Sequence, residues 1–213
     1  LTETGWMSFP EYVKRPVPIA EWQADDNTIA FKAPSQVHQY DFDGELHTFD
    51  AKGFSQHVTG NHRMRYHRPS ANRDHAVVAE AATLTDKTRL HFQTAGFYTG
   101  TQRLDPAFAR LLVATQADGC IRDRTHISFR FKRRRKIERL RTLLASLNID
   151  GHERCTADGV TQFTLCKNDA LPVIAWLGPE KVYGAWLLQL DAATLDCMLA
   201  ELVHWDGHQA KTS

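Results

Sequence analysis

The sequence has no apolar run of membrane-spanning length and no signal-peptide pattern at its start. A transmembrane helix needs about 20 consecutive apolar residues, so we expect no membrane span and no membrane partner. A soluble, cytoplasmic protein is the expectation that follows. Apolar residues nonetheless make up 42% of the 213 residues, which is enough to build the core of one large domain or two small ones.

Cysteine is scarce, and its spacing excludes the usual cysteine-based scaffolds. The chain contains only Cys120, Cys155, Cys166 and Cys197, and no two of them form a CxxC pair. This spacing argues against a zinc knuckle and gives little support to a disulfide framework. We therefore expect four buried thiols.

Neither sign of charge dominates the chain. Lysine and arginine total 26 and aspartate and glutamate 25, so the net charge is only +1 and no overall field indicates a nucleic-acid partner. The positive charge is unevenly placed, however. Between Arg122 and Arg141 there are ten basic and two acidic residues, a local net charge of +8.

The amino-terminal part reads as β-structure. Residues 1–66 contain short alternating apolar segments separated by turn signals, among them Asp25-Asp26-Asn27 and Asp43-Gly44. Such spacing predicts an all-β module with hairpins. We place this module at 1–79 and a connector with one short helix at 80–104.

From residue 105 onward the pattern changes to α+β, with helices and strands in alternation. Pro106 suits the first turn of a helix, and leucines recur at helical spacing after the basic run. The predicted elements in order are a helix over 106–118, strands within 120–134, a helix within 135–149, a hairpin turning at Asp158-Gly159, a helix near 169–178 and a helix over 192–205. We treat 105–213 as one domain.

Two of these helices end in the same dipeptide, Asp118-Gly119 and Asp206-Gly207. A carboxylate in the last turn of a helix faces the negative end of the macrodipole, which costs up to about 1 kcal/mol unless a cation offsets it. Taken singly, each dipeptide is an ordinary helix end. Taken together, they predict two adjacent helices whose acids meet at one edge and hold divalent ions that activate water for phosphodiester hydrolysis.

The two stretches resemble the motif of the LAGLIDADG homing endonucleases. "LAELVHWDG" at 199–207 agrees at the Leu, Ala, Leu, acid and Gly positions, and "LLVATQADG" at 111–119 keeps the final Ala-Asp-Gly. The resemblance implies a magnesium-dependent nuclease that cuts both strands of a long DNA site, with Asp118 and Asp206 as catalytic metal ligands. It also implies a basic residue near the metals, for which Lys181 is the equivalent position. The alternative for Lys181 is an ordinary surface lysine.

The strand that follows the first motif has the alternation of a DNA-binding surface. Ile127, Phe129 and Phe131 point to one side, so the basic and polar residues between them point to the other. Arginine and lysine on an open β-surface fit phosphates and guanine edges. The predicted DNA contacts are Arg122, Arg124, His126, Ser128, Arg130, Lys132, Arg154 and Gln162. A solvated charged face is the alternative for part of this run.

A second resemblance concerns the amino-terminal module. "VTGNHRMRY" at 58–66 is similar to the Thr-x-x-His box of inteins and related Hint proteins, which implies that Thr59 and His62 polarise a scissile peptide bond. Splicing also needs a Cys or Ser at the first position and an Asn at the last, but the printed chain begins with Leu1 and ends with Ser213. We therefore expect no splicing from the chain as printed.

The combined interpretation is an intein-associated homing endonuclease, or an amino-terminal portion of one. Only six residues follow Gly207, so we expect the second ββαββ half to be missing. Two alternatives remain open. One is a DNA-binding module without catalytic activity, and the other is the amino-terminal half of a split intein that needs a carboxy-terminal partner fragment for protein splicing.

Overall fold

The structure is a computed structural model that describes residues 1–51, 54–67, 76–85, 90–93 and 95–205. The chain divides into two compact units. Unit 1 comprises residues 1–12 and 99–213, and unit 2 comprises residues 13–98. Asp206, one of the two predicted metal ligands, lies outside the described residues.

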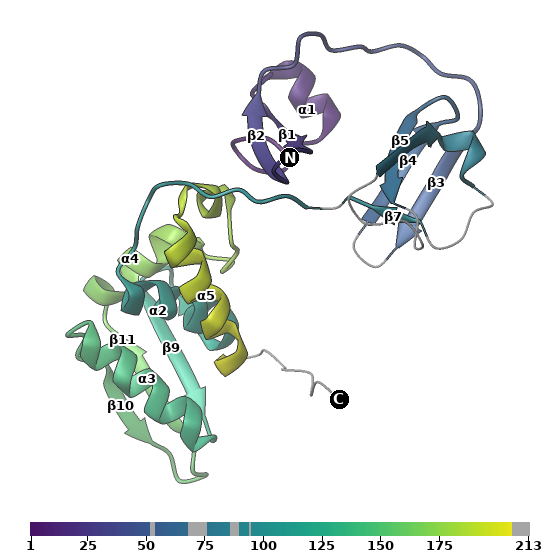
Figure 1. The fold of residues 1–213 in the computed structure, drawn as a ribbon. Helices are drawn as coiled ribbons and strands as arrows, with labels where there is room; N and C mark the ends of the chain where they lie inside the picture. Colours follow the sequence, from purple (N-terminus) through teal and green to yellow (C-terminus); the bar gives the residue numbers. More distant parts are fainter. Residues whose placement is uncertain (52–53, 68–75, 86–89, 94, 206–213) are drawn as a thin grey trace. The chain divides into compact units, whose positions relative to one another are not determined.

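Unit 1 is a mixed α+β structure with one antiparallel sheet (Figure 1). Its elements are α2 (Pro106–Asp118), β8 (Cys120–Arg122), β9 (His126–Phe131), α3 (Arg134–Ser146), β10 (His152–Cys155), β11 (Thr161–Leu165), α4 (Lys167–Leu177), η2 (Ala185–Gln189) and α5 (Ala192–Trp205). The strands follow the order β10-β11-β9-β8 across the sheet. The predicted helices over 106–118 and 192–205 are confirmed.

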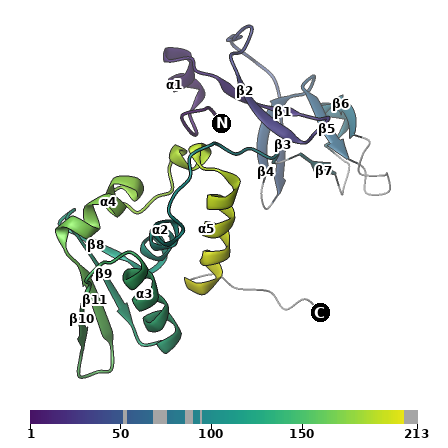
Figure 2. The same cartoon turned by 60° about the vertical axis from the view of Figure 1, so that its left-hand side comes forward.

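Helix α2 lies in the core of unit 1. Leu111, Leu112 and Val113 are fully buried in succession, so the helix contacts neighbours on nearly every side. Helix α5 runs alongside it, with α3 close by (Figure 2). The start of α2 is defined by Asp105, whose carboxylate accepts hydrogen bonds from the backbone N–H groups of Ala107 and Phe108 at 2.9 Å each.

One face of the sheet belongs to this core. Ile127 and Phe129 of β9 are fully buried, and Phe131 is 4% exposed. They pack with Phe163 of β11 and with residues of α2, α3 and α4 in one continuous apolar cluster. The predicted alternation of β9 is therefore confirmed for its apolar side.

Unit 2 is built from small antiparallel sheets. Its strands are β1 (Ile19–Gln23), β2 (Thr28–Lys32), β3 (Leu46–Ala51), β4 (Phe54–Thr59), β5 (Arg63–His67), β6 (Ala76–Glu80) and β7 (His91–Phe92), with η1 at Ala81–Thr83. They form the pairs β1-β2 and β3-β4 and the three-stranded sheet β6-β5-β7. The small core gathers around Met64, Tyr66 and Leu84.

Two expectations about the amino-terminal part are wrong in detail. The residues expected to be all-β include a short helix, α1 (Phe9–Lys14), at whose start the Glu11 carboxylate accepts hydrogen bonds from the backbone N–H and the hydroxyl of Ser8. The Asp43-Gly44 pair does not join two strands, since residues 33–45 contain no strand and β3 pairs with β4 instead. The Asp25-Asp26-Asn27 turn between β1 and β2 is confirmed.

The expectation of four buried thiols is also wrong. Cys120, Cys155 and Cys166 are exposed, and Cys197 is half-buried. Cys120 and Cys155 lie on β8 and β10, the two edge strands of the sheet.

No helix in the described part of the chain is long and apolar enough to span a membrane. The expected module boundaries at 79/80 and 104/105 stay predictions.

Candidate metal centre and nucleic-acid interface

The end of α2 gathers positive charge around Asp118. Asp118 is the last residue of the helix, and Lys136 of α3 places its Nζ 2.5 Å from the Asp118 Oδ2. The Lys136 side chain is only 10% exposed and that of Asp118 22%, so solvent screens this ion pair weakly. The carboxylate oxygens therefore already face a cation.

A second lysine binds the same helix end. Lys181 Nζ donates to the carbonyl oxygen of Gly119 at 2.6 Å and to that of Gln116 at 3.3 Å. Its own backbone has a φ of 55°, the left-handed region that non-glycine residues seldom adopt. Lys136 and Lys181 thus offset both the macrodipole and the carboxylate of α2. These contacts are those of a helix-capping lysine, and the role of Lys181 as a basic residue near the metals stays a prediction.

The donor chemistry at this point suits a hard cation. Carboxylate oxygens are ligands that Mg²⁺ prefers, and the ammonium of Lys136 shows that the site attracts positive charge. Within the described residues, no three His, Cys, Asp or Glu side chains cluster as a metal site. Because Asp206 lies outside those residues, a shared site for Asp118 and Asp206 stays a prediction, and so does Mg²⁺.

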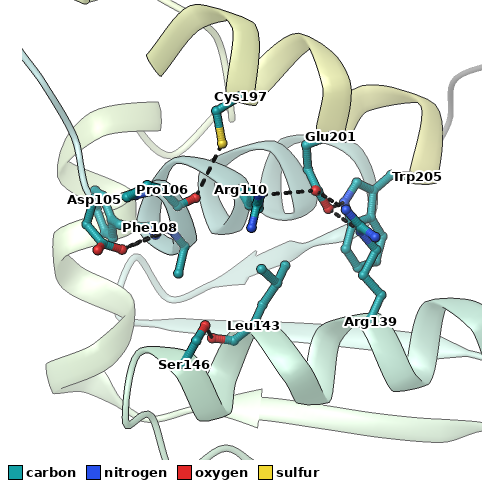
Figure 3. A network of polar contacts seen from close by, with 11 residues as sticks. Asp105, Pro106, Phe108, Arg110, Arg139, Leu143, Ser146, Cys197, Glu201 and Trp205 are labelled. Carbon is teal, nitrogen blue, oxygen red and sulfur yellow. Dashed lines mark hydrogen bonds and ion pairs between the residues drawn. The ribbon is translucent and has the colours of Figure 1, made fainter. Parts of the chain in front are cut away.

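Helix α5 contains a buried acid that the sequence interpretation missed. Glu201 is 1% exposed, and Figure 3 shows its carboxylate pointing toward α2 and α3. Arg139 of α3 binds both carboxylate oxygens, with its Nε 2.6 Å from Oε1. Trp205 donates its indole N–H to the same Oε1 at 2.7 Å, and Arg110 of α2 lies 3.8 Å from Oε2. The hydrogen bonds that Arg139 donates to the Glu201 carboxylate raise the pKa of Arg139 above its ordinary value.

The last turn of α5 has one more contact with α3. Arg135 donates from Nη1 to the backbone carbonyl of His204 at 2.7 Å. Arg135, Lys136 and Arg139 therefore all face the ends of α2 and α5, although they belong to the run predicted as a charged outer face. Arg139 follows Lys136 by three residues and Arg135 by four, and this helical spacing is the signal that could have separated them from the solvated residues.

The outer face of the sheet is polar and basic. Strand register places Arg154, Gln162 and Arg130 side by side across β10, β11 and β9, and Arg122 opposite His126 across β8 and β9. Directly opposed residues point to the same face, and these five point away from the apolar cluster. Gln162 is half-buried and the other four are exposed.

The remaining predicted DNA contacts differ in their location and exposure. Arg124 lies in the turn between β8 and β9 with a φ of 55°, and Lys132 is exposed just after β9. Ser128 belongs to the outer face but is only 2% exposed, with Cys120 and Thr164 opposite it on either side. Its buried hydroxyl is a poor candidate for a direct DNA contact.

The predicted splicing box lies in unit 2. Thr59 ends β4, and its hydroxyl donates to the side-chain oxygen of Asn61 at 2.7 Å. His62 lies in the turn before β5 with an exposed side chain, and its backbone N–H donates to the Thr59 carbonyl at 3.0 Å. The two residues are thus neighbours across one tight turn, which leaves the role implied by the resemblance a prediction.

Comparison with known proteins adds no assignment. No protein-family model matches the chain, and no curated protein is significantly similar to it.

Proposed function

We propose that this chain is a DNA endonuclease of the LAGLIDADG type that depends on Mg²⁺, or a portion of one. One observation supports the proposal above the others. Helices α2 and α5 lie side by side, α2 ends in a carboxylate bound by a cationic group, and the chain passes from that carboxylate within two residues into a sheet with a basic outer face. This arrangement offers phosphate binding and an acidic site close together in the chain.

In the proposed reaction, Arg122, Arg130 and Arg154 hold the DNA backbone against the outer face of the sheet. Arginine suits this because its guanidinium group binds phosphate oxygens in a bidentate way. Asp118 and Asp206 would hold Mg²⁺, which supplies activation of water for phosphodiester hydrolysis. Lys136 and Lys181 contribute positive charge beside the acids, where negative charge develops on the phosphate.

The amino-terminal unit would be the intein-type module of such a protein. Support for this is limited to the β-rich architecture of unit 2 and the Thr59 and His62 pair at the β4–β5 turn. The expectation that the printed chain does not splice on its own stays a prediction, and so does the alternative of splicing with a carboxy-terminal partner fragment.

One feature favours a second candidate, a DNA-binding module without nuclease activity. The ammonium of Lys136 already neutralises Asp118 at 2.5 Å, so a divalent ion must compete with it. If the Lys136 ammonium stays bound to Asp118 under all conditions, the basic sheet would bind DNA but the acids would hold no metal ion.

Plasmid nicking separates the two candidates. The full chain would be incubated with supercoiled plasmid at low ionic strength with Mg²⁺ or Mn²⁺, and the Asp118→Asn variant would be compared with Asp196→Asn, an exposed carboxylate on α5. We expect Asp118→Asn to reduce nicking by at least about 100-fold, because a metal ligand matters at least as much as the groups that orient it. Asp196→Asn should nick like the unchanged protein. DNA binding without nicking under both metals would favour the second candidate.

A further inference from the structure

A pocket lies between α2 and α3, on the side of unit 1 where helices cover the sheet (Figure 3). Its volume is about 340 Å³, and the described residues that line it are Arg110 of α2 and Arg135, Glu138, Arg139, Thr142 and Leu143 of α3. Pockets that hold small ligands have volumes from about 300 Å³ upward. The pocket is therefore large enough for a small molecule, and arginine is its most frequent lining residue.

The lining has more positive than negative charge. Arg139 donates hydrogen bonds to the buried Glu201, which neutralises one of the three guanidinium groups. The Glu138 carboxylate is bound at 2.7 Å by Arg141, a residue outside the lining. In the described part of the chain, the other two arginines have no carboxylate within hydrogen-bonding distance. Because like charges held close together repel each other, this excess of positive charge favours an anion in the pocket.

The three guanidinium groups also keep hydrogen-bond donors for a ligand, since each has several N–H groups. Arg139 uses its Nε and Nη2 on Glu201, and Arg135 uses its Nη1 on the backbone carbonyl of His204 at 2.7 Å. Arg110 lies 3.8 Å from Glu201 and donates no hydrogen bond within the described residues. Arg139 and Arg135 are already held by protein contacts, so ligand binding costs them little side-chain entropy.

The number of arginines favours a phosphate group over other anions. The planar fork of arginine matches both carboxylates and phosphates, but a carboxylate has a single negative charge. A phosphate monoester has a charge of about −1.5 to −2 at pH 7 and three strong acceptor oxygens. It can therefore bind several guanidinium groups at once. A phosphodiester of a DNA backbone has only one charge, and an open basic surface is sufficient to bind it.

We propose that the pocket between α2 and α3 binds a phosphate monoester, carried by a small molecule or by the end of a nucleic-acid strand. Arg110 and Arg135 supply the excess charge, and Arg139 adds a guanidinium held in place by the buried Glu201. The inference does not depend on the proposed function. None of the three arginines belongs to the outer face of the sheet or binds the Asp118 carboxylate.

The test titrates inorganic phosphate into the full chain and follows the NMR signals of the backbone amides and of the arginine Nε–H groups. Arg110→Gln and Arg135→Gln should each weaken phosphate binding about tenfold, because each removes hydrogen bonds to a charged group. Both side chains are exposed, so the fold should stay intact, and the melting temperature checks this. Arg130→Gln on the outer face of the sheet is the matched control and should bind phosphate like the unchanged protein.

A second titration identifies the source of the phosphate. Two single-stranded oligonucleotides of the same sequence would be compared, one with a 5′ phosphate and one without. If the 5′ phosphate strengthens binding to the unchanged protein but not to Arg110→Gln, the pocket takes the end of a nucleic-acid strand. If the 5′ phosphate has no effect but the binding of inorganic phosphate depends on Arg110, the ligand is a small phosphorylated molecule. Either result supports the phosphate site.

Two results would overturn the inference. One is equal phosphate affinity in Arg110→Gln, Arg135→Gln and Arg130→Gln, or no phosphate binding by the unchanged protein. The other is a loss of duplex binding in Arg110→Gln while the binding of inorganic phosphate stays the same. Arg110 would then belong to a surface for the DNA backbone and not to a pocket for a phosphate monoester.

Discussion

The two units of this chain differ in how their strands are supported. In unit 1 one four-stranded sheet packs against helices, and a single apolar cluster extends from α2 to Trp205 of α5. In unit 2 the sheets β3-β4 and β6-β5-β7 share a modest cluster around Tyr66 to which β1 and β2 contribute no described residue, and large apolar side chains such as Leu46 and Val78 remain exposed at 55% and 47%. The four-stranded sheet of unit 1 has one buried apolar face and one open face with several exposed basic residues. A face of that kind is what a DNA-binding surface requires.

The largest expected effect is the loss of stability after a core substitution, and it should differ between the two units. Leu112→Ala in α2 should lower the stability of unit 1 by about 4–5 kcal/mol, because the side chain is fully buried between helices that cannot collapse into the space. Met64→Ala in β5 should lower the stability of unit 2 by about 2–3 kcal/mol, because the smaller core around it can relax into the cavity. Hydrogen exchange of β9 and β5 in denaturant measures each loss. Equal losses would remove the claimed difference in packing.

The next effect concerns the charged faces. Arg130→Ala on β9 should weaken binding to a labelled duplex roughly tenfold and make its salt dependence shallower by about one unit of slope. Arg63→Ala, an exposed arginine on β5 of unit 2, is the matched change. If both variants weaken binding alike, the outer sheet of unit 1 is not the preferred DNA surface.

A smaller effect is expected from Tyr183, which lies in the same loop as Lys181. Burial raises the pKa of Tyr183 to about 12, and within the described residues its hydroxyl has no hydrogen-bond partner. Above about pH 10 the unfolded chain releases this proton but the folded chain does not, so folding stability falls as the pH rises toward 12.

Tyr183→Phe removes that titration. We expect the variant to match the unchanged protein at pH 8 and to lose less stability between pH 10 and pH 12 in urea titrations. An identical alkaline loss in both proteins would show that Tyr183 ionises without penalty in the folded state.

The smallest effect is expected at the predicted splicing box. His62→Ala changes an exposed turn residue of unit 2, so stability should change by less than about 0.5 kcal/mol. DNA binding should stay the same, because the residue is not on the outer sheet of unit 1. A clear loss of DNA binding in this variant would show that unit 2 takes part in recognition.

The helices of unit 1 were easier to predict from the sequence than the strand pairing of unit 2, and the reason is physical. Helices over 106–118 and 192–205 were predictable because each is an apolar run closed by an Asp-Gly pair and Pro106 suits the first turn of the first one. In unit 2 the strands are short, and most of them pair with the next strand in the sequence. Local alternation cannot tell which run finds a partner, and Asp43-Gly44 therefore looked like a hairpin that does not form.

The candidate site was predictable only in part. Asp118, Lys181 and the outward residues of β9 follow from motif position and alternation. The roles of Lys136 and Glu201 do not, because a charged residue on an amphipathic helix is normally solvated. Their pairing depends on the packing of α3 against α2 and α5, which a single sequence does not specify.

The central claim is that Asp118 holds a divalent ion, and diffraction from crystals grown with Mn²⁺ tests it most directly. The account predicts anomalous density at the Asp118 carboxylate, about 2.1–2.2 Å from an oxygen, with the Lys136 ammonium displaced from its present distance of 2.5 Å. Crystals that contain Mn²⁺ yet have no anomalous density there, with Lys136 still bound to Asp118, would contradict it.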